Sequence, residues 1–326
     1  TKPVFVSNPS FSYADAGYSS WRPTRSKAVY VSANDGMLHA FDGDGVTGGA
    51  EKWAYVPSFV LNKIWKIADT NYAANHRFFV DGPITVGDVY INSNWRTVLV
   101  AGLGKGGNGY FAIDVTDPDA PEVLWEFTQS NMGYTYGNPE IVKLPDGTWV
   151  AIVSSGYNNV PSANGGNAPS GDGVGRLYVI NIADGSLMFT MSTGVGSTGN
   201  PSNLGKISSW VANASQDNTA LYVYAGDMLG NLWRFTLPST TPASGSTLSG
   251  YPTVLKLFAA PSGQMITVKP ELGSTDGSID HRMVMFGTGR YLSLDDKTDL
   301  SQQSIYGIYD DTLVTNLTTM PAQSDL

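Results

Sequence analysis

The 326-residue chain contains no cysteine, which excludes disulfide bonds, thiolate metal sites and cysteine nucleophiles. Charged residues make up 14% of the chain, against roughly 25% in an average protein, and the net charge is −9. Lys and Arg do not cluster, so we expect neither nucleic acid nor an anionic membrane surface as a partner. No apolar run reaches the length of about 18 residues that a transmembrane helix needs.

The chain is rich in the residues of turns and sheets. It holds 37 glycines and 18 prolines, and aromatic residues make up 11% of it. An alternating apolar phrase interrupted by glycine recurs five times. Its copies begin at Val29, Val98, Val150, Leu221 and Met283. Such alternation predicts strands that place one face on a core, with glycine permitting the turns between them.

The spacing of these copies predicts the architecture. Each interval is long enough for one propeller blade, which takes roughly 40–50 residues, together with long loops. In three copies a turn glycine is followed, five positions later, by a large apolar residue of the next strand. These pairs are Gly36–Phe41, Gly175–Ile180 and Gly230–Phe235. A lone sheet cannot cover its own apolar faces, whereas sheets stacked around an axis cover each other. A pair of β-sandwiches is the alternative.

We therefore predict an all-β fold, a modified β-propeller of six to seven blades. The count adds the strands at both chain ends to the five copies. The core is expected to include Phe41, Ile113, Ile180 and Phe235. One short helical insertion is predicted at 57–69, where apolar residues recur at helical spacing after Pro57 and Ser58. We expect this helix to pack on the propeller rim; a partner-docking or membrane-surface helix is the alternative.

Catalytic signatures are few. The histidines, His39, His76 and His281, lie far apart and lack metal-ligand spacing, and no G-x-S-x-G elbow occurs. The glycine run at 102–109 joins two strands rather than a strand and a helix, so it predicts a hairpin turn and not a phosphate site. The pair Asp42 and Asp44 fails as a calcium loop, because the later ligand positions are apolar.

A weak calcium signal precedes the fourth repeat. Asn213, Ser215 and Asp217 stand at the alternate spacing of a calcium loop, while Leu221 occupies the ninth position. Asp217 is the one carboxylate among the four. Calcium affinity depends on the number of charged ligands, so we expect no tight site here.

The repeats resemble a known family. The phrases YVSANDGMLHAFD, HRFFVDGPITVGDVYI, TVLVAGLGKGGNGYFAIDVTDP and VYAGDMLGNLWRF are similar to the C-terminal propeller of the PilC/PilY pilus-tip proteins of bacterial type IV pili. The resemblance spans roughly residues 26–310 and implies a quinoprotein-like repeat, export, and roles in pilus assembly, retraction and adhesion. It also implies a calcium loop whose ligands fall on Asn213, Ser215, Asp217 and Leu221, where this chain departs from the acidic pattern.

The resulting hypothesis is a non-enzymatic module. Residues 1–326 are expected to form a single β-propeller domain, an excised C-terminal part of a longer exported protein found at the cell surface, pilus tip or outer membrane. Expected partners are minor pilins or other tip components, with host or abiotic surfaces. No cofactor is expected, and calcium binding would be weak. The alternative is a quinoprotein-like oxidoreductase that uses pyrroloquinoline quinone.

Overall fold

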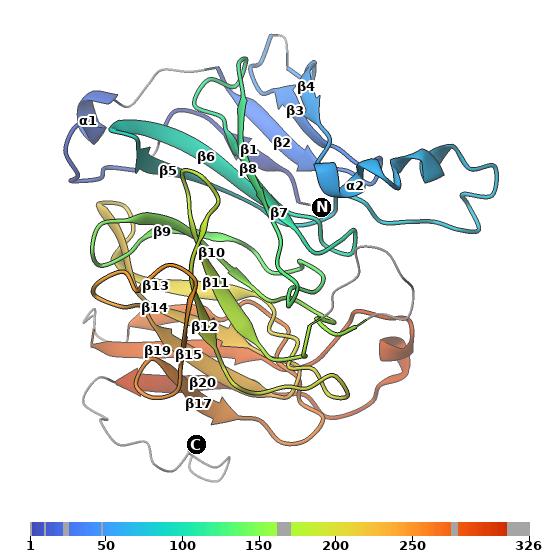
Figure 1. The fold of residues 1–326 in the computed structure, drawn as a ribbon, viewed down its shortest axis with the longest axis vertical. Helices are drawn as coiled ribbons and strands as arrows, with labels where there is room; N and C mark the ends of the chain where they lie inside the picture. Colours follow the sequence, from blue (N-terminus) through green and yellow to red (C-terminus); the bar gives the residue numbers. More distant parts are fainter. Residues whose placement is uncertain are drawn as a thin grey trace.

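The computed structural model describes residues 2–9, 11–21, 26–46, 48–161, 171–274 and 280–311. Within these ranges the strands form four hydrogen-bonded sheets, and the nine-stranded one divides at a single bridge into two. The resulting five sheets follow one another from the blue end of the molecule to the red end in Figure 1. We call these sheets blades 1 to 5. Because strands dominate and the helices are single turns, the predicted all-β class is confirmed.

Each blade is built from neighbouring segments of the chain. Blade 1 contains β1 (Val4–Val6), β2 (Ala28–Ser32), β3 (Leu38–Asp42) and β4 (Glu51–Tyr55). Blade 2 contains β5 (Ile84–Ile91), β6 (Asn94–Gly102), β7 (Tyr110–Asp114) and β8 (Glu122–Phe127). In both blades the strands pair in sequence order, so every strand is antiparallel to the next.

Blades 3 and 4 are joined at one edge. Blade 3 contains β9 (Glu140–Lys143), β10 (Trp149–Ser154), β11 (Arg176–Asn181) and β12 (Leu187–Ser192), to which β16 (Ser246–Ser249) adds in parallel. Blade 4 contains β13 (Ile207–Asn213), β14 (Asp217–Gly226), β15 (Asn231–Thr236) and β17 (Val254–Ala259). A single parallel bridge between Lys143 and Thr219 connects the two blades.

Blade 5 has three strands, β18 (Glu271–Ser274), β19 (His281–Gly287) and β20 (Ile305–Asp311). The described residues thus form five blades, and the expected count of six to seven is corrected. The expected count is too high because the strands near the chain ends do not form separate blades. In the structure, β1 completes blade 1 by pairing with β2, and β18 and β20 flank β19.

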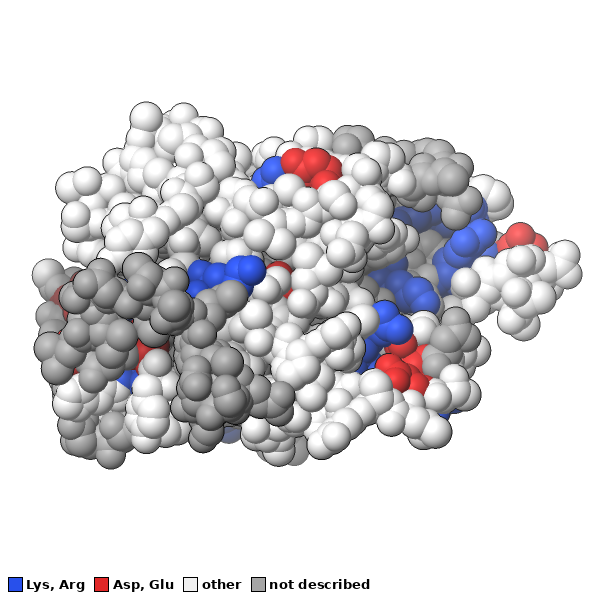
Figure 2. Space-filling view, turned by 90° about the horizontal axis from the view of Figure 1, so that it is seen from below, with Lys and Arg blue, Asp and Glu red and all other residues white. Residues whose placement is uncertain are grey.

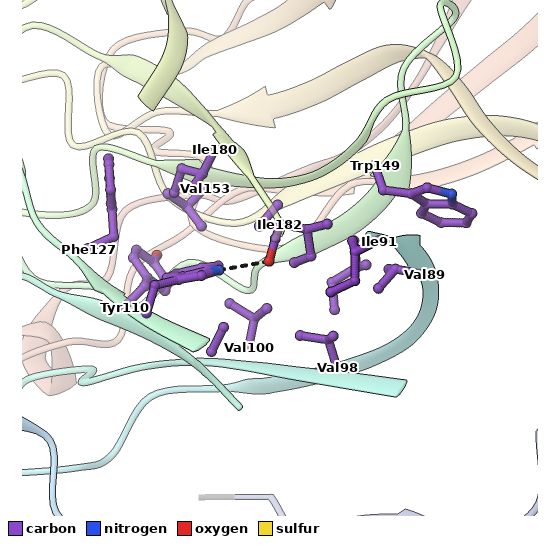
Figure 3. Packing of buried hydrophobic residues seen from close by; sticks show 14 of the residues in the cluster. Val89, Ile91, Val98, Val100, Tyr110, Phe127, Trp149, Val153, Ile180 and Ile182 are labelled. Carbon is purple, nitrogen blue, oxygen red and sulfur yellow. Dashed lines mark hydrogen bonds between the residues drawn. The ribbon is translucent and has the colours of Figure 1, made fainter. Parts of the chain in front are cut away.

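Four hydrophobic clusters fill the four spaces between consecutive blades. The strands of the inner blades supply two clusters at once, because successive side chains point to opposite faces. Val98 and Val100 of β6 face blade 3, whereas Leu99 and Ala101 face blade 1. Figure 3 shows the cluster between blades 2 and 3, where the Trp125 indole donates to the Ile182 carbonyl.

Three of the four predicted core residues are buried. Ile113, Ile180 and Phe235 are each 1% exposed or less, and they lie in three different clusters. Phe41 is only half-buried, because blade 1 buries one face and Phe41 lies on the other. The phrase that repeats in blades 1 and 4 is a hairpin turn, in which Gly36 and Gly230 adopt φ of +100° and +82°.

Asp227 explains why the blade 4 phrase carries polar residues. Its buried carboxylate accepts hydrogen bonds from the Leu229 and Asn231 backbone amides, the Asn231 side chain, the Ser202 hydroxyl and the Trp233 indole. A buried charge is tolerated only when such donors surround it. The motif therefore fixes the turn and positions Trp233 in the core between blades 3 and 4.

The helical insertion between blades 1 and 2 consists of two short helices rather than one. These are α2 (Ser58–Leu61) and η1 (Ile64–Ala68), which are separated by Asn62 and Lys63. We call residues 57–80 the arm, because its outer part projects beyond the sheets in Figure 1. The other helices are α1 (Tyr18–Trp21) and η2 (Asp295–Thr298). No helix among the described residues is long and apolar enough to cross a membrane.

Candidate functional site

The predicted calcium-loop residues lie in the tight hairpin that joins β13 to β14. Asn213 pairs with Asp217 across this hairpin, and the Gln216 amide donates to the Asn213 carbonyl. The side chains of the turn bond to each other, since the Ser215 hydroxyl donates to Asn213 Oδ1 over 2.8 Å. Leu221 lies inside β14, so the fourth expected position belongs to a regular strand.

A lysine from blade 3 contacts the one carboxylate of the hairpin. Lys143, the last residue of β9, places its Nζ 3.0 Å from Asp217 Oδ1 and 2.6 Å from Asp15 Oδ1. Asp217 Oδ1 also accepts from the Thr219 amide and hydroxyl. Lys143 is 11% exposed, so this ammonium lies largely out of solvent between two carboxylates. We call Asp15, Lys143 and Asp217 the lysine junction.

The N-terminal segment is fixed beside the same hairpin. The Ser12 and Ala14 amides donate to the Ser215 and Gln216 carbonyls. Between them, the buried Tyr13 ring packs 5.8 Å from Trp149, measured between ring centroids. Three segments that are distant in sequence therefore meet at the lysine junction: residues 12–15, the end of β9 and the β13–β14 hairpin.

The electrostatics of the junction favour the charged forms. Burial lowers the pKa of Lys143, but hydrogen bonds to Asp15 and Asp217 outweigh it and raise the pKa above its ordinary value. Burial raises the pKa of Asp217, but the Thr219 hydroxyl and the Lys143 ammonium outweigh it, and the pKa lies below the usual range. The junction is a charged contact with one cation already in place.

The donor set suits calcium poorly, because that ion takes six to eight oxygen ligands and gains affinity from carboxylates. Asp217 Oδ1 is already bound by three donors, and Asn213 Oδ1 by the Ser215 hydroxyl. Within the described ranges, no group of three or more His, Asp or Glu side chains is placed to hold a metal ion. The degenerate calcium loop at Asn213, Ser215 and Asp217 stays a prediction.

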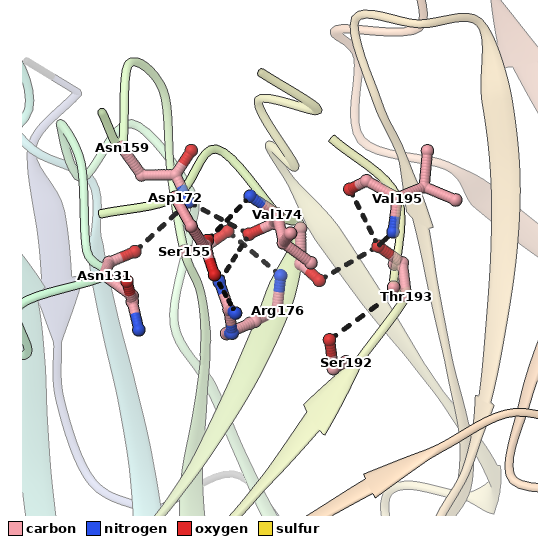
Figure 4. Close-up of polar contacts among 11 residues, drawn as sticks. Asn131, Ser155, Asn159, Asp172, Val174, Arg176, Ser192, Thr193 and Val195 are labelled. Carbon is pink, nitrogen blue, oxygen red and sulfur yellow. Dashed lines mark hydrogen bonds and ion pairs between the residues drawn. The ribbon is translucent and has the colours of Figure 1, made fainter. Parts of the chain in front are cut away.

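The polar side chains at one end of blade 3 bond mainly to each other and to the backbone (Figure 4). Arg176 forms an ion pair with Asp172 over 2.6 Å and holds the pKa of that carboxyl at about 2. The Ser155 hydroxyl accepts from the Arg176 amide, and the Asn159 amide group donates to the Asn131 and Val174 carbonyls. This arrangement holds loops together and pairs no serine with a histidine.

His39 also has a structural environment. Its Nδ1 lies 2.7 Å from Glu51 Oε1 and its Nε2 lies 2.9 Å from Asp35 Oδ2. His76 contacts the Asn34 side chain within the arm region. His39 and His76 thus bond to the neighbouring residues Asp35 and Asn34, which lie between β2 and β3.

The arm is fixed at its base and exposed on its outer side. Val60, Phe79 and Val80 are buried against blades 1 and 2. Lys63 Nζ donates to the Gly106 carbonyl of the glycine run, which forms the connection from β6 to β7 as predicted. Farther out, Leu61 and Trp65 are 57% and 63% exposed. The arm therefore presents a tryptophan and a leucine, four positions apart, to solvent.

Charged side chains are sparse on the face of the molecule seen from below, and the basic ones gather toward its right side (Figure 2). Most of the described residues on that face are uncharged.

Comparison with known proteins identifies the family. Residues 4–323 match the family described as the PilY1 beta-propeller domain. The chain belongs to the PilY1 β-propeller family. The crystal structure of the *Pseudomonas aeruginosa* PilY1 C-terminal domain superposes with a TM-score of 0.73 and 32% identity, over 94% of this chain and 64% of that one. The predicted propeller architecture and family resemblance are thereby confirmed.

Curated PilY1 relatives give the same family. The type IV pilus biogenesis factor PilY1 of *Pseudomonas aeruginosa* PAO1 is 33% identical over 325 residues, which cover 93% of this chain. A type IV pilus biogenesis factor PilY1 homolog of *Xylella fastidiosa* is 35% identical over 305 residues, or 88% of this chain. The chain spans 26% and 19% of the lengths of these two relatives.

Sequence reasoning did not find Asp15 and Lys143, the other two members of the lysine junction in this PilY1-family chain. Asp15 lies 128 positions from Lys143, and neither belongs to a recognisable motif. Sequence offers one signal: Lys143 directly follows the two apolar residues Ile141 and Val142 of a strand, where an ammonium group that is shielded from water needs an anion. Only the three-dimensional arrangement supplies that anion.

Proposed function

We propose that residues 1–326 act as a non-enzymatic binding and assembly module of type IV pili, which docks minor pilins at the pilus tip. The observation that carries the proposal is the family match over residues 4–323. Roles in pilus biogenesis, retraction control and surface adhesion belong to the same proposal, as does a location at the cell surface. The described polar clusters support it, because their side chains serve to hold loops and blades together.

The outer side of the arm is the docking surface that we assign to a minor pilin. Exposed tryptophan is enriched among residues that dominate binding energy at protein interfaces. Leu61, the last residue of α2, and Trp65 in η1 are both exposed on the arm, whose base is anchored in the core. A rigidly held apolar pair of this kind loses little conformational entropy on binding.

The test measures binding of the full-length protein to each purified minor pilin of its organism. Wild-type protein should bind at least one of them, and the double variant Trp65→Ala, Leu61→Ala should bind at least tenfold more weakly, about 1.4 kcal/mol. Leu300→Ala is the control, since Leu300 is 94% exposed elsewhere on the chain. Failure of every minor pilin to bind wild-type protein would contradict the proposal.

Cell-based and enzymatic measurements test the remaining parts. Cells that lack the protein should lose surface pili and regain them with the wild-type gene.

Dye-linked alcohol oxidation after addition of pyrroloquinoline quinone and calcium should stay at the blank rate, and turnover above the blank would favour the oxidoreductase alternative.

A further inference from the structure

The lysine junction joins three separate parts of the molecule through one ammonium group. Asp15 comes from the N-terminal segment, Lys143 from blade 3 and Asp217 from the blade 4 hairpin. Among the described residues, the bridge between Lys143 and Thr219 is also the one point where strands of blades 3 and 4 pair. The ammonium therefore lies where blades 3 and 4 meet and where the N-terminal segment crosses them.

The two carboxylates need a positive charge between them. Both Asp15 Oδ1 and Asp217 Oδ1 lie within 3.0 Å of the same nitrogen, so they are close to each other as well. Without a cation, two ionised carboxylates at this separation would repel each other. An ammonium group supplies one charge and three donors, but it cannot dissociate from the chain as a metal ion can.

We propose that the Lys143 ammonium is a built-in cation that replaces a bound divalent ion in holding the N-terminal segment and the β13–β14 hairpin to blade 3. The junction then stays closed at any calcium concentration. The replacement also explains why the hairpin keeps a single carboxylate, since Asp15 and Lys143 complete the charge balance without further acidic residues. This inference concerns the fold alone and stands whether or not the proposed pilin binding is found.

The decisive variant is Lys143→Met, which keeps most of the apolar stem and removes the charge. We expect its Tm in EDTA to fall by roughly 4 °C or more below that of wild type. Millimolar calcium should restore at least half of this loss, because the two freed carboxylates can then share a divalent ion. Wild type and Lys143→Arg both retain the charge. For each of these two proteins, the Tm in EDTA should equal the Tm in calcium.

Terbium luminescence is a second measurement, and it reports where the ion binds. A terbium ion that takes the place of calcium emits light when an aromatic ring close to it transfers excitation energy to it. The Trp149 ring centroid is 5.8 Å from Lys143 Nζ, and Tyr13 packs on Trp149. Lys143→Met should therefore gain terbium emission that wild type lacks. The added substitution Asp217→Asn should abolish that gain.

Matched controls separate this role from that of an ordinary ion pair. Lys269→Met removes a lysine that lies 2.9 Å from Glu140 at a more exposed site, and its Tm should not respond to calcium. Three results would overturn the proposal: a Lys143→Met variant as stable as wild type, one that is destabilised without recovery in calcium, or a wild-type Tm that falls in EDTA.

A folding failure of Lys143→Met leaves the proposal testable. In that case Asp15→Asn and Asp217→Asn are compared with Glu140→Gln, the partner of the control lysine. Each of the two junction variants should lower the Tm more than Glu140→Gln does. Equal effects would show that the junction is no more than a surface ion pair and would contradict the proposal.

Discussion

At the scale of single residues, burial decides which repeat positions matter for stability. Phe235 and Phe41 occupy equivalent places in the repeated phrase, yet Phe235 is fully buried between blades 3 and 4 while Phe41 lies on the outer face of blade 1. Sequence alone treats them alike, because both follow the same turn glycine at the same spacing. The structure distinguishes them through their neighbours.

We expect Phe235→Ala to lower the free energy of unfolding by about 3–5 kcal/mol, the usual cost of deleting a buried phenylalanine. Phe41→Ala is the matched control and should cost less than half as much. Chemical denaturation of both variants measures the difference. Equal costs would mean that the outer face of blade 1 is covered in solution.

His39 predicts a pH dependence of stability. Burial lowers its pKa, but hydrogen bonds to Glu51 and Asp35 and the charges of these groups outweigh burial and raise the pKa above its ordinary value. A folded-state pKa above the unfolded value of about 6.5 stabilises the protein fully below pH 6.5. This contribution is then lost as the pH rises through the folded-state pKa.

The difference in Tm between wild type and His39→Gln should therefore be larger at about pH 5.5 than at about pH 9, where the histidine is neutral. His76→Gln, which removes a histidine bonded to the Asn34 amide, serves as the control. Melting curves at both pH values test this. A larger Tm difference at the alkaline pH would contradict a raised pKa of His39 in the folded state.

At the scale of elements, the strands were predictable and the connections were less so. The inner strand β10 is apolar up to its last residue and is buried on both faces, whereas in β2 and β19 burial alternates because only one face is fully buried. The apolar run of β10 can be read from sequence, whereas the one-sided burial of β2 cannot, because its half-buried positions are apolar as well. The arm was predicted as one helix, but it breaks between Leu61 and Ile64, since its residues pack on a glycine run that no local pattern reveals.

The base of the arm depends on that glycine run. A Cβ atom added at Gly106 would lie 1.7 Å from the Phe79 carbonyl oxygen, so Gly106→Ala must push the arm away. We expect a loss of about 1–3 kcal/mol, typical of overpacking, and faster proteolysis within residues 62–75. Gly199→Ala is the control, because nothing lies within 4 Å of its added Cβ. An undisturbed cleavage rate in Gly106→Ala would show that the arm is held elsewhere.

At the scale of the whole molecule, contacts between distant segments decide what sequence reasoning could reach. The family and the propeller were predictable because the repeats are long and ordered. The lysine junction was not, since Asp15, Lys143 and Asp217 come from three segments that are distant in sequence. The blade count failed for a similar reason: whether a terminal strand completes a neighbouring sheet or begins a new one depends on pairing, which sequence does not record.

The N-terminal segment gives the last prediction, because it ties blades 2, 3 and 4 together. Tyr13 packs within 5.8 Å, between ring centroids, of both Trp95 in blade 2 and Trp149 in blade 3, and its neighbours Ser12 and Ala14 donate to the blade 4 hairpin. Tyr13 is 4% exposed, so Tyr13→Ala should cost about 3–5 kcal/mol, as for other large buried side chains.

We expect Tyr13→Ala to destabilise the segments around Tyr13 before it destabilises the whole propeller. Hydrogen exchange in Tyr13→Ala should rise first at the ends of β5, β9 and the β13–β14 hairpin, which the segment contacts, and should stay unchanged in blade 5. Phe5→Ala provides the control, since Phe5 belongs to the same N-terminal region but is 58% exposed. Uniformly faster exchange across all blades would instead mean that the propeller unfolds as one cooperative unit, with the N-terminal segment adding stability but no separate link between its blades.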